Sequence, residues 1–236
     1  MDVVYLVKGP NQASGNEDLR YSLRSLAANI PHDQIWIVGY CPRWLTGVRH
    51  INSRSSGDKW WNLPTDLMAA ARHPEISDSF AYWNDDFFAL TPQDVVPLRH
   101  RGLLSAYVGR RGAACSSYVM GQRQTLALLR SWGYEEPRSY ETHMPLVMDK
   151  PTVLEALGRA LAEFRGRALA YRSVYGAVAG LEGSKIEDMK MACTGGHIPA
   201  GWQWISTSDR SFGSGRIGRE LRAMFPQPCA YERSEG

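Results

Sequence analysis

Two adjacent acids, Asp85 and Asp86, follow a run of aromatic and apolar residues at positions 80–83. That run contains no turn-forming residue and is typical of a buried strand. Two carboxylates at the end of such a strand are costly to desolvate unless a positive group meets them. A divalent cation that holds a diphosphate is one such group, because Mg²⁺ and Mn²⁺ take oxygen ligands and bridge to phosphate oxygens. The pair therefore indicates a nucleotide-sugar site. The alternative is that the acids cap the next segment or pair with an arginine.

Two arginines, Arg20 and Arg24, lie four residues apart in a predicted helix at residues 17–28. Leucines recur along this helix at the spacing of a buried stripe, and both arginines flank that stripe. Their guanidinium groups could face a phosphate. Alternatively, their stems pack on the surface while the charges stay in solvent.

Four further side chains are candidates from their type and position. Lys59 could contact a phosphate, and one of the tryptophans that follow it, Trp60 or Trp61, could stack on a base or a sugar. His143 lies in a polar stretch that ends at a proline, and Arg172 stands at the start of a helix, where its permanently charged fork could hold a phosphate. Each has an alternative without a functional role. The lysine could lie in a solvated loop and the tryptophan in the core, while the histidine could be structural and the arginine could lie on the surface.

The C-terminal part is less specific. Residues 211–216 (SFGSGR) resemble a phosphate-cradling glycine loop, although a mobile loop explains them as well. Arginines at positions 210, 216, 219 and 222 could form a surface that follows a phosphate backbone, or simply a solvated helix face. The sequence contains no Walker loop, dinucleotide fingerprint, nucleophile elbow or zinc-ligand spacing.

Short apolar strands alternate with amphipathic helices along the chain. Strands are predicted at residues 3–7, 34–38, 80–83, 103–108 and 202–206, and helices at 17–28, 63–73, 119–132, 152–164, 172–181 and 216–225. This alternation predicts an α/β fold with a mostly parallel sheet and helices on both faces. Ligands bind such sheets at the carboxyl ends of the strands, which is where Asp85 and Asp86 fall. With no repeat or long linker, residues 1–236 are predicted to form one domain.

Composition narrows the class of protein. The chain has 236 residues, 44% of them hydrophobic, and no apolar run long enough to span a membrane. Its N-terminus does not resemble a signal peptide, and its four cysteines have no metal-ligand spacing, so we expect a cytoplasmic protein with reduced thiols. A net charge of +3 allows an anionic substrate but does not by itself indicate a nucleic-acid-binding protein.

Taken in order, these segments resemble the Stealth family, the sugar-1-phosphate transferases of capsule synthesis and lysosomal mannose-phosphate tagging. Four ordered blocks that cover nearly the whole chain carry the resemblance. They are residues 2–5 (DVVY); residues 17–25 (EDLRYSLRS), 35–38, 42–45, 61–62, 73–74, 76–77 and 82–86 (YWNDD); residues 143–145 (HMP) and 171–173 (YRS); and residues 206–209 and 225–232 (FPQPCAYE).

The resemblance implies a Rossmann-like core of the glycosyltransferase-A type, a nucleotide-sugar donor such as a UDP-sugar, and Mg²⁺ or Mn²⁺. Carried over residue by residue, the resemblance places Asn84, Asp85 and Asp86 at the metal and the diphosphate. It places Arg20, Arg24 and Asn62 at the donor. It implies catalytic roles for His143 and Arg172, and Asp209 is a less specific match. The acidic first loop of the family is replaced here by residues 8–11 (KGPN), and the usual insertions are missing. The acceptor, and even the bond attacked, can therefore differ.

We thus expect a metal-dependent transferase that moves a sugar-1-phosphate or a sugar onto an acceptor hydroxyl, in a bacterial or phage-infected cell. The acceptor would be a saccharide, or alternatively a hydroxymethylated pyrimidine in DNA. The rival from another class is a non-catalytic sugar- or nucleotide-binding module.

Overall fold

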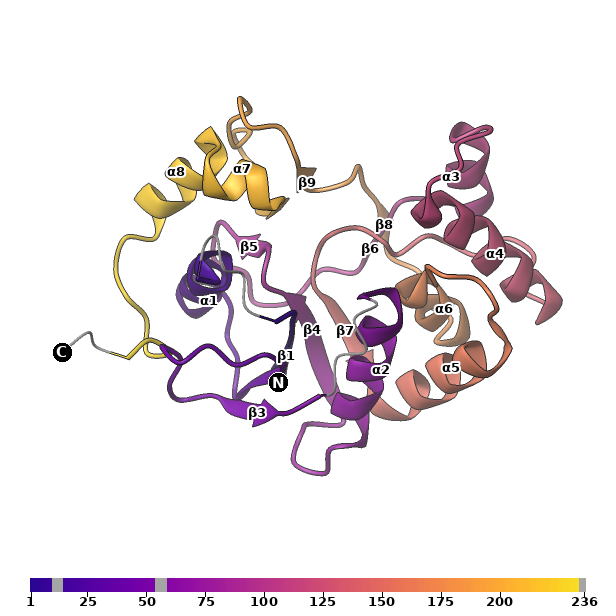
Figure 1. Cartoon of the computed structure of the whole chain (residues 1–236), viewed down its shortest axis with the longest axis horizontal. Coiled ribbons are helices and arrows are strands. Elements are labelled where there is room, and N and C mark those ends of the chain that lie inside the picture. The colour runs from indigo at the N-terminus through magenta and orange to yellow at the C-terminus, as the bar shows by residue number, and fades with distance from the viewer. Residues whose placement is uncertain (10–14, 54–58, 234–236) are drawn as a thin grey trace.

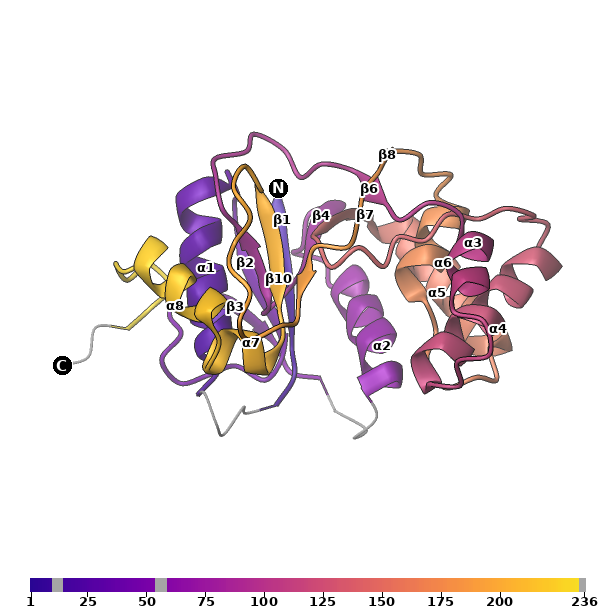
Figure 2. The same cartoon turned by 90° about the horizontal axis from the view of Figure 1, so that it is seen from above.

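The computed structural model describes residues 1–9, 15–53 and 59–233, and it has an α/β fold (Figures 1 and 2). Its central sheet contains, from edge to edge, β3 (Arg49–Ile51), β2 (Ile35–Gly39), β1 (Asp2–Val7), β4 (Ser79–Asn84) and β7 (Leu146–Asp149). The first four strands are parallel, and β7 is antiparallel to β4. The predicted fold class, a mostly parallel sheet with helices on both faces, is confirmed.

Alternate residues of β1 account for the two layers of helices. Val3, Tyr5 and Val7 pack in the apolar cluster of α1 (Glu17–Asn29). Val4 and Leu6 pack in a second cluster with residues of α2 (Lys59–Arg72) and α5 (Lys150–Glu163). Since successive side chains of a strand point to opposite faces, this alternation requires α1 and α2 to cover opposite sides of the sheet, as Figure 2 shows.

A second, smaller sheet begins directly after the turn that holds Asp85 and Asp86. It consists of β5 (Phe87–Ala89), β10 (Trp204–Thr207) and β9 (Lys190–Met191). Two short helices, α7 (Asp209–Gly213) and α8 (Arg216–Met224), pack on it through a cluster that includes Phe88, Ile205 and Phe212. This sheet brings the late part of the chain beside the carboxyl end of β4.

The remaining elements lie beyond β7. They are α3 (Leu104–Arg110), α4 (Ser117–Ser131), α6 (Tyr171–Val178) and the parallel pair β6 (Arg99–His100) and β8 (Ser184–Lys185). The strand predicted at residues 103–108 is wrong, because this segment forms α3. Leu104 and Tyr107, three residues apart, are the two buried side chains of α3, which is the spacing of a helix face.

The last described residues return to the first half of the chain. Glu232 forms a β-bridge with Leu45, and the backbone N–H of Thr46 donates to the carbonyl of Tyr231. Figure 1 shows this segment passing from α8 beyond α1. Within the described part of the chain, no helix has both the length and the apolar character that crossing a membrane requires.

Candidate active site

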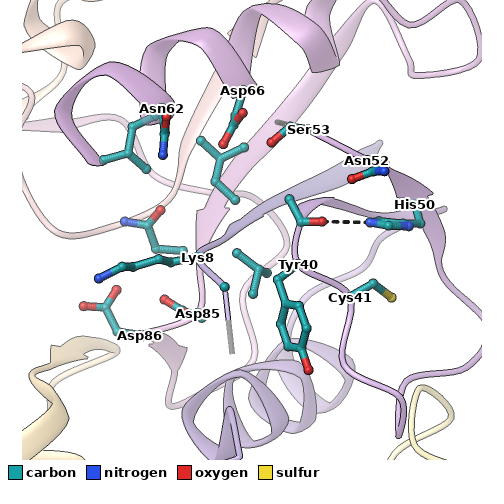
Figure 3. Close-up of a pocket in the computed structure, with 16 residues that line it drawn as sticks. Lys8, Tyr40, Cys41, His50, Asn52, Ser53, Asn62, Asp66, Asp85 and Asp86 are labelled. Atoms are coloured by element: carbon teal, nitrogen blue, oxygen red, sulfur yellow. Dashed lines mark hydrogen bonds between the residues drawn. The ribbon is translucent and has the colours of Figure 1, made fainter. Parts of the chain in front are cut away.

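A cavity of about 870 Å³ opens where β1, β2, β3 and β4 end (Figure 3). Polar residues follow each of these strands, and the first turns of α2 lie across from them. The polar side chains that line the cavity include Lys8 after β1, Tyr40 and Cys41 after β2, Asn52 and Ser53 after β3, Asn62 and Asp66 of α2, and Asn84, Asp85 and Asp86 at the end of β4. This is the edge of a parallel sheet at which ligands bind.

The two carboxylate oxygens of Asp86 differ in their hydrogen bonding. Its Oδ2 accepts hydrogen bonds from the Nζ of Lys190 and from the hydroxyl of Ser206, the latter at 3.0 Å. Its Oδ1 is buried and has no hydrogen-bond partner in the described part of the chain. A buried carboxylate oxygen without a donor is costly, and a cation or a ligand donor would remove that cost.

Negative charges crowd the turn after β4. Burial raises the pKa of Asp85 well above its ordinary value, and the charges of Asp18 and Asp86 raise it further. Burial, followed by repulsion from Asp86 and Asp209, raises the pKa of Asp18 to about 6. Ionised Asp85 and Asp18 are therefore poorly stabilised by the protein alone, and a bound cation would relieve the repulsion between these acids.

The side chains of this turn fit a divalent cation only in part. Asp85 and Asp86 are hard oxygen donors, and the buried Oδ1 of Asp86 has no hydrogen-bond partner among the described residues. The described residues contain no group of three or more His, Cys, Asp or Glu side chains that could hold a metal. A two-carboxylate site suits Mg²⁺ or Mn²⁺ when substrate phosphates and waters complete the coordination shell.

The raised pKa of Asp18 predicts a definite dependence of stability on pH. The folded chain holds this proton up to about pH 6, whereas the unfolded chain releases it near pH 3.9. Because the folded state binds the extra proton between these values, the free energy of unfolding falls as pH rises from about 4 to 6. Asp18→Asn should therefore gain stability over the unsubstituted chain as pH rises. Urea unfolding at about pH 4.5 and 7 measures this, and an equal difference at both pH values would show that Asp18 titrates normally.

His143 is paired with an acid that the sequence did not point out. Its Nδ1 lies 2.8 Å from the Oδ1 of Asp188, which also forms an ion pair of 3.1 Å with Arg101. Burial alone would raise the pKa of Asp188, but the hydrogen bond with His143, the charge of His143 and Arg101 together hold it below its ordinary value. An ionised Asp188 accepts from Nδ1–H, which leaves Nε2 of His143 as the atom that can take a proton.

Two residues further on, Lys190 connects this pair to the acids after β4. The backbone N–H of Lys190 donates to Asp188 at 3.4 Å, while its Nζ donates to Asp86 and to the carbonyl of Thr207. Residues 188–190 therefore tie His143 to the carboxyl end of β4. Asp188 and Lys190 could not be placed near His143 and Asp86 from the sequence, because the sequence around them contains no apolar strand pattern.

Arg172 lies behind the loop that carries His143 rather than in the cavity. It is 4% exposed, and its Nη2 donates to the carbonyl of Met144 at 2.6 Å and to the hydroxyl of Thr142 at 3.3 Å. These partners flank His143, whose backbone adopts a left-handed conformation with φ 47°. Arg172 is not among the residues that line the cavity, and its contacts fit a residue that positions His143.

Arg20 and Arg24 are not among the described residues that line the cavity, so the donor-binding role expected of them stays a prediction. Arg24 donates to both carboxylate oxygens of Glu232, at 2.7 and 2.8 Å, and to the carbonyls of Phe225 and Pro226, both at 3.1 Å. Arg20 lies 3.5 Å from Glu232, and its guanidinium packs 4.7 Å from the ring centre of Trp44. The spacing of the two arginines serves to anchor the C-terminal segment.

Arg24→Ala should destabilise the fold without removing a donor contact. Both partners of this ion pair are buried, with side-chain exposures of 7% and 4%, so removal of Arg24 leaves Glu232 with only the longer 3.5 Å ion pair to Arg20. Such a loss costs about 3–5 kcal/mol. Denaturant unfolding measures the change, with Arg159→Ala, in an exposed pair with Glu163, as the matched control at under about 1 kcal/mol. Equal effects of the two variants would contradict this account.

Of the other predicted donor residues, two line the cavity. Asn62 comes from α2, and Asn84 ends β4, where its Oδ1 accepts from the hydroxyl of Tyr82 at 2.7 Å. Lys59 is the first residue of α2, and its side chain lies outside the described residues. Trp60 packs near Tyr118, with ring centres 6.0 Å apart, and Trp61 is 49% exposed.

The C-terminal candidates adopt helical structure. Residues 211–213 end α7, Ser214 and Gly215 form the turn between the two helices, and Arg216 begins α8. Phosphate binding by this segment stays a prediction. Arg222 donates to both carboxylate oxygens of Glu17, and Arg216 pairs with Glu220 at 2.9 Å. With two of its arginines neutralised in this way, α8 gives little support to a surface that follows a phosphate backbone.

No family model matches the chain, and no curated protein matches its sequence. Among solved structures, it is similar to the glycosyltransferase GlyE of Streptococcus pneumoniae TIGR4 in its apo form, with 12% identity over 80% of this chain and 45% of that chain and a TM-score of 0.38. The chain thus spans less than half the length of GlyE. It is also similar to the galactosyltransferase LgtC in complex with donor and acceptor sugar analogs, with 11% identity over 78% of this chain and 72% of that chain and a TM-score of 0.41. A third similar structure is that of mouse xyloside xylosyltransferase 1, with 10% identity over 98% of this chain and 96% of that chain and a TM-score of 0.39.

Proposed function

We propose that the chain is a metal-dependent transferase that moves a sugar or a sugar-1-phosphate from a nucleotide sugar to an acceptor hydroxyl. The observation that carries this proposal is the cavity at the carboxyl ends of four parallel strands, with Asp85 and Asp86 inside it. A volume of about 870 Å³ lies within the range of small-molecule sites. The ordered motifs that resemble the Stealth family support the same class of reaction.

The donor would lie across the ends of β1 and β4. Lys8 supplies a positive charge for the phosphates, and Asn62 and Asn84 supply amide groups for the sugar or the phosphates. Asp85 and Asp86 would hold the divalent cation, which neutralises charge on the diphosphate when it is bound. Lys190, already paired with Asp86, adds a second positive charge near the same place.

His143 would act as the general base. Its Nε2 takes the proton of the acceptor hydroxyl while Asp188 holds Nδ1–H and stabilises the imidazolium. In sugar transfer, the acceptor oxygen bonds to the anomeric carbon and a nucleoside diphosphate leaves. In sugar-1-phosphate transfer, that oxygen bonds to the sugar-proximal phosphorus and a nucleoside monophosphate leaves. Arg172 contributes by fixing the backbone on both sides of His143.

A donor panel tests the proposal. The chain is incubated with UDP-, GDP- and CDP-sugars, with Mg²⁺ or Mn²⁺, and with saccharide acceptors or hydroxymethylated duplex DNA. Mass spectrometry then identifies the released nucleotide. We expect metal-dependent release of a diphosphate for sugar transfer or a monophosphate for sugar-1-phosphate transfer. Donor binding without release of either nucleotide would favour the non-catalytic binding module.

A further inference from the structure

A second, basic cavity of about 490 Å³ lies between α3 and the segment around β8. Among the residues that the structure describes, it shares no lining residue with the cavity at the ends of the strands. The residues that line it are Arg101, Tyr107, Arg110, Arg111, Lys185, Ile186 and Glu187. Nothing in the proposed donor site or in the positioning of His143 uses Arg110, Arg111 or Lys185.

Three of the four cationic side chains that line this cavity are not neutralised by a described acid. Arg110, Arg111 and Lys185 are exposed, and none of them forms an ion pair with a described residue. Arg101 and Arg111 lie 4.7 and 5.2 Å from the ring centre of Tyr107, which spaces the two guanidinium groups on one aromatic side chain. Glu187 is the single acid among the described lining residues. Such a concentration of cations fits a group with two negative charges.

The basic cavity is connected to His143 through its most buried cation. Arg101 forms the 3.1 Å ion pair with Asp188, and the same carboxylate binds His143. The chain then runs from Lys185 and Ile186 at this cavity through Asp188 to Lys190 beside Asp86. Figure 1 shows this segment, β8 to β9, crossing from the side of α3 toward α7. A ligand in the basic cavity would therefore be connected to the proposed general base through Arg101 and Asp188.

Three aromatic rings form contacts that link α2, α4 and α3. Tyr118 packs 6.0 Å from Trp60 at the start of α2 and 6.5 Å from Tyr107 in the basic cavity, measured between ring centres. Since α2 also supplies Asn62 to the first cavity, these rings connect the donor side to the cationic side. Aromatic faces are suitable surfaces for sugar rings, which present apolar C–H groups.

We propose that the basic cavity binds a phosphate monoester carried by the acceptor, a phosphorylated saccharide, and so presents the acceptor hydroxyl to His143. This inference rests on the proposed function. A discrete cavity with cations on two sides suits a terminal phosphate better than a continuous nucleic-acid backbone. Helix α8 gives little separate support for nucleic-acid binding, because Arg216 and Arg222 are paired with acids.

Protein-observed NMR of the full chain tests this site with named probes. Amide shifts are followed during titration with glucose 6-phosphate, inorganic phosphate, glucose and a duplex oligonucleotide. Glucose 6-phosphate should shift amides within residues 101–111 and 185–188, glucose should not, and inorganic phosphate should bind more weakly. Arg110→Gln/Lys185→Gln should weaken glucose 6-phosphate about tenfold, since two charges are lost, whereas the matched Arg216→Gln/Arg219→Gln variant on α8 should not.

Absence of shifts at these amides, equal shifts with glucose, or unchanged affinity in the double variant would overturn the site. Inorganic phosphate that binds as tightly as the sugar phosphate would overturn the saccharide assignment. Tighter, steeply salt-dependent binding of the duplex at the same amides would overturn it in favour of a nucleic acid. A parallel titration with UDP and Mg²⁺, a diamagnetic ion, reports on Lys8, Asn62 and Asp85. Loss of UDP binding alone would count against the proposed function, and loss of glucose 6-phosphate binding alone against the acceptor site.

Discussion

Asp85→Asn and Asp86→Asn should each lower turnover about 10³-fold while the chain stays folded. A neutral amide cannot replace a carboxylate that holds a cation against the diphosphate, and loss of one such electrostatic contact costs about 10²–10³ in rate or more. Asp86→Asn loses its ion pair with Lys190 and should be modestly less stable, but it should remain folded. Asp85→Asn removes one of several repelling acids and should leave the chain equally or more stable. Initial rates with Mn²⁺ and urea unfolding measure the two effects.

The matched control is Asp94→Asn, an exposed acid outside the cavity. It should retain the rate and the stability of the unsubstituted chain. If Asp85→Asn and Asp86→Asn keep normal rates and normal Mn²⁺ dependence, the acids after β4 have no metal role. If they lose activity only because they unfold, the carboxylates are structural.

His143→Ala should lower the rate about 10²–10⁴-fold and leave donor affinity nearly unchanged, because a general base acts on the acceptor proton and need not touch the nucleotide. Rates at saturating acceptor and calorimetry with the donor separate these quantities. Full activity of His143→Ala across about pH 6 to 9 would show that the histidine is structural and that another group takes the proton.

Two variants test how His143 is held. Asp188→Asn should lower kcat and leave the KM of the donor unchanged, since Asp188 contacts His143 and not the donor cavity. Arg172→Lys should act in the same direction, because a lysine cannot reproduce the fork that contacts Thr142 and Met144. A rise in the donor KM with unchanged kcat would instead place either residue at the donor.

Those parts of the fold that depend on local sequence were predictable. The apolar run of β1 and the aromatic run of β4 identify themselves as strands, and the leucines of α1 identify its buried face. Asp85 and Asp86 follow β4 directly, so the parallel sheet alone places them at the ligand edge. The prediction for residues 104–110 was wrong because a seven-residue helix contains too few turns for its hydrophobic period to be distinguished from that of a strand.

Partners far apart in sequence were not predictable. Arg24 resembled a phosphate ligand because its neutralising acid, Glu232, lies 208 residues further on. Asp188 and Lys190 lie in a polar segment whose position depends on the pairing of β9 with β10. Arg172 was expected at a phosphate, but the loop that it contacts can only be seen once α6 is folded against residues 142–144.

Calorimetric titration of UDP, GDP and CDP into the chain, with and without Mn²⁺, tests the central claim most directly. The account predicts that at least one nucleoside diphosphate binds, that removal of Mn²⁺ weakens its binding about tenfold or more, and that Asp85→Asn abolishes the effect of Mn²⁺. The corresponding nucleoside without phosphates should bind far more weakly. Binding of no diphosphate, or binding with equal affinity with and without Mn²⁺ in both proteins, would contradict a metal-dependent nucleotide-sugar site at the end of β4.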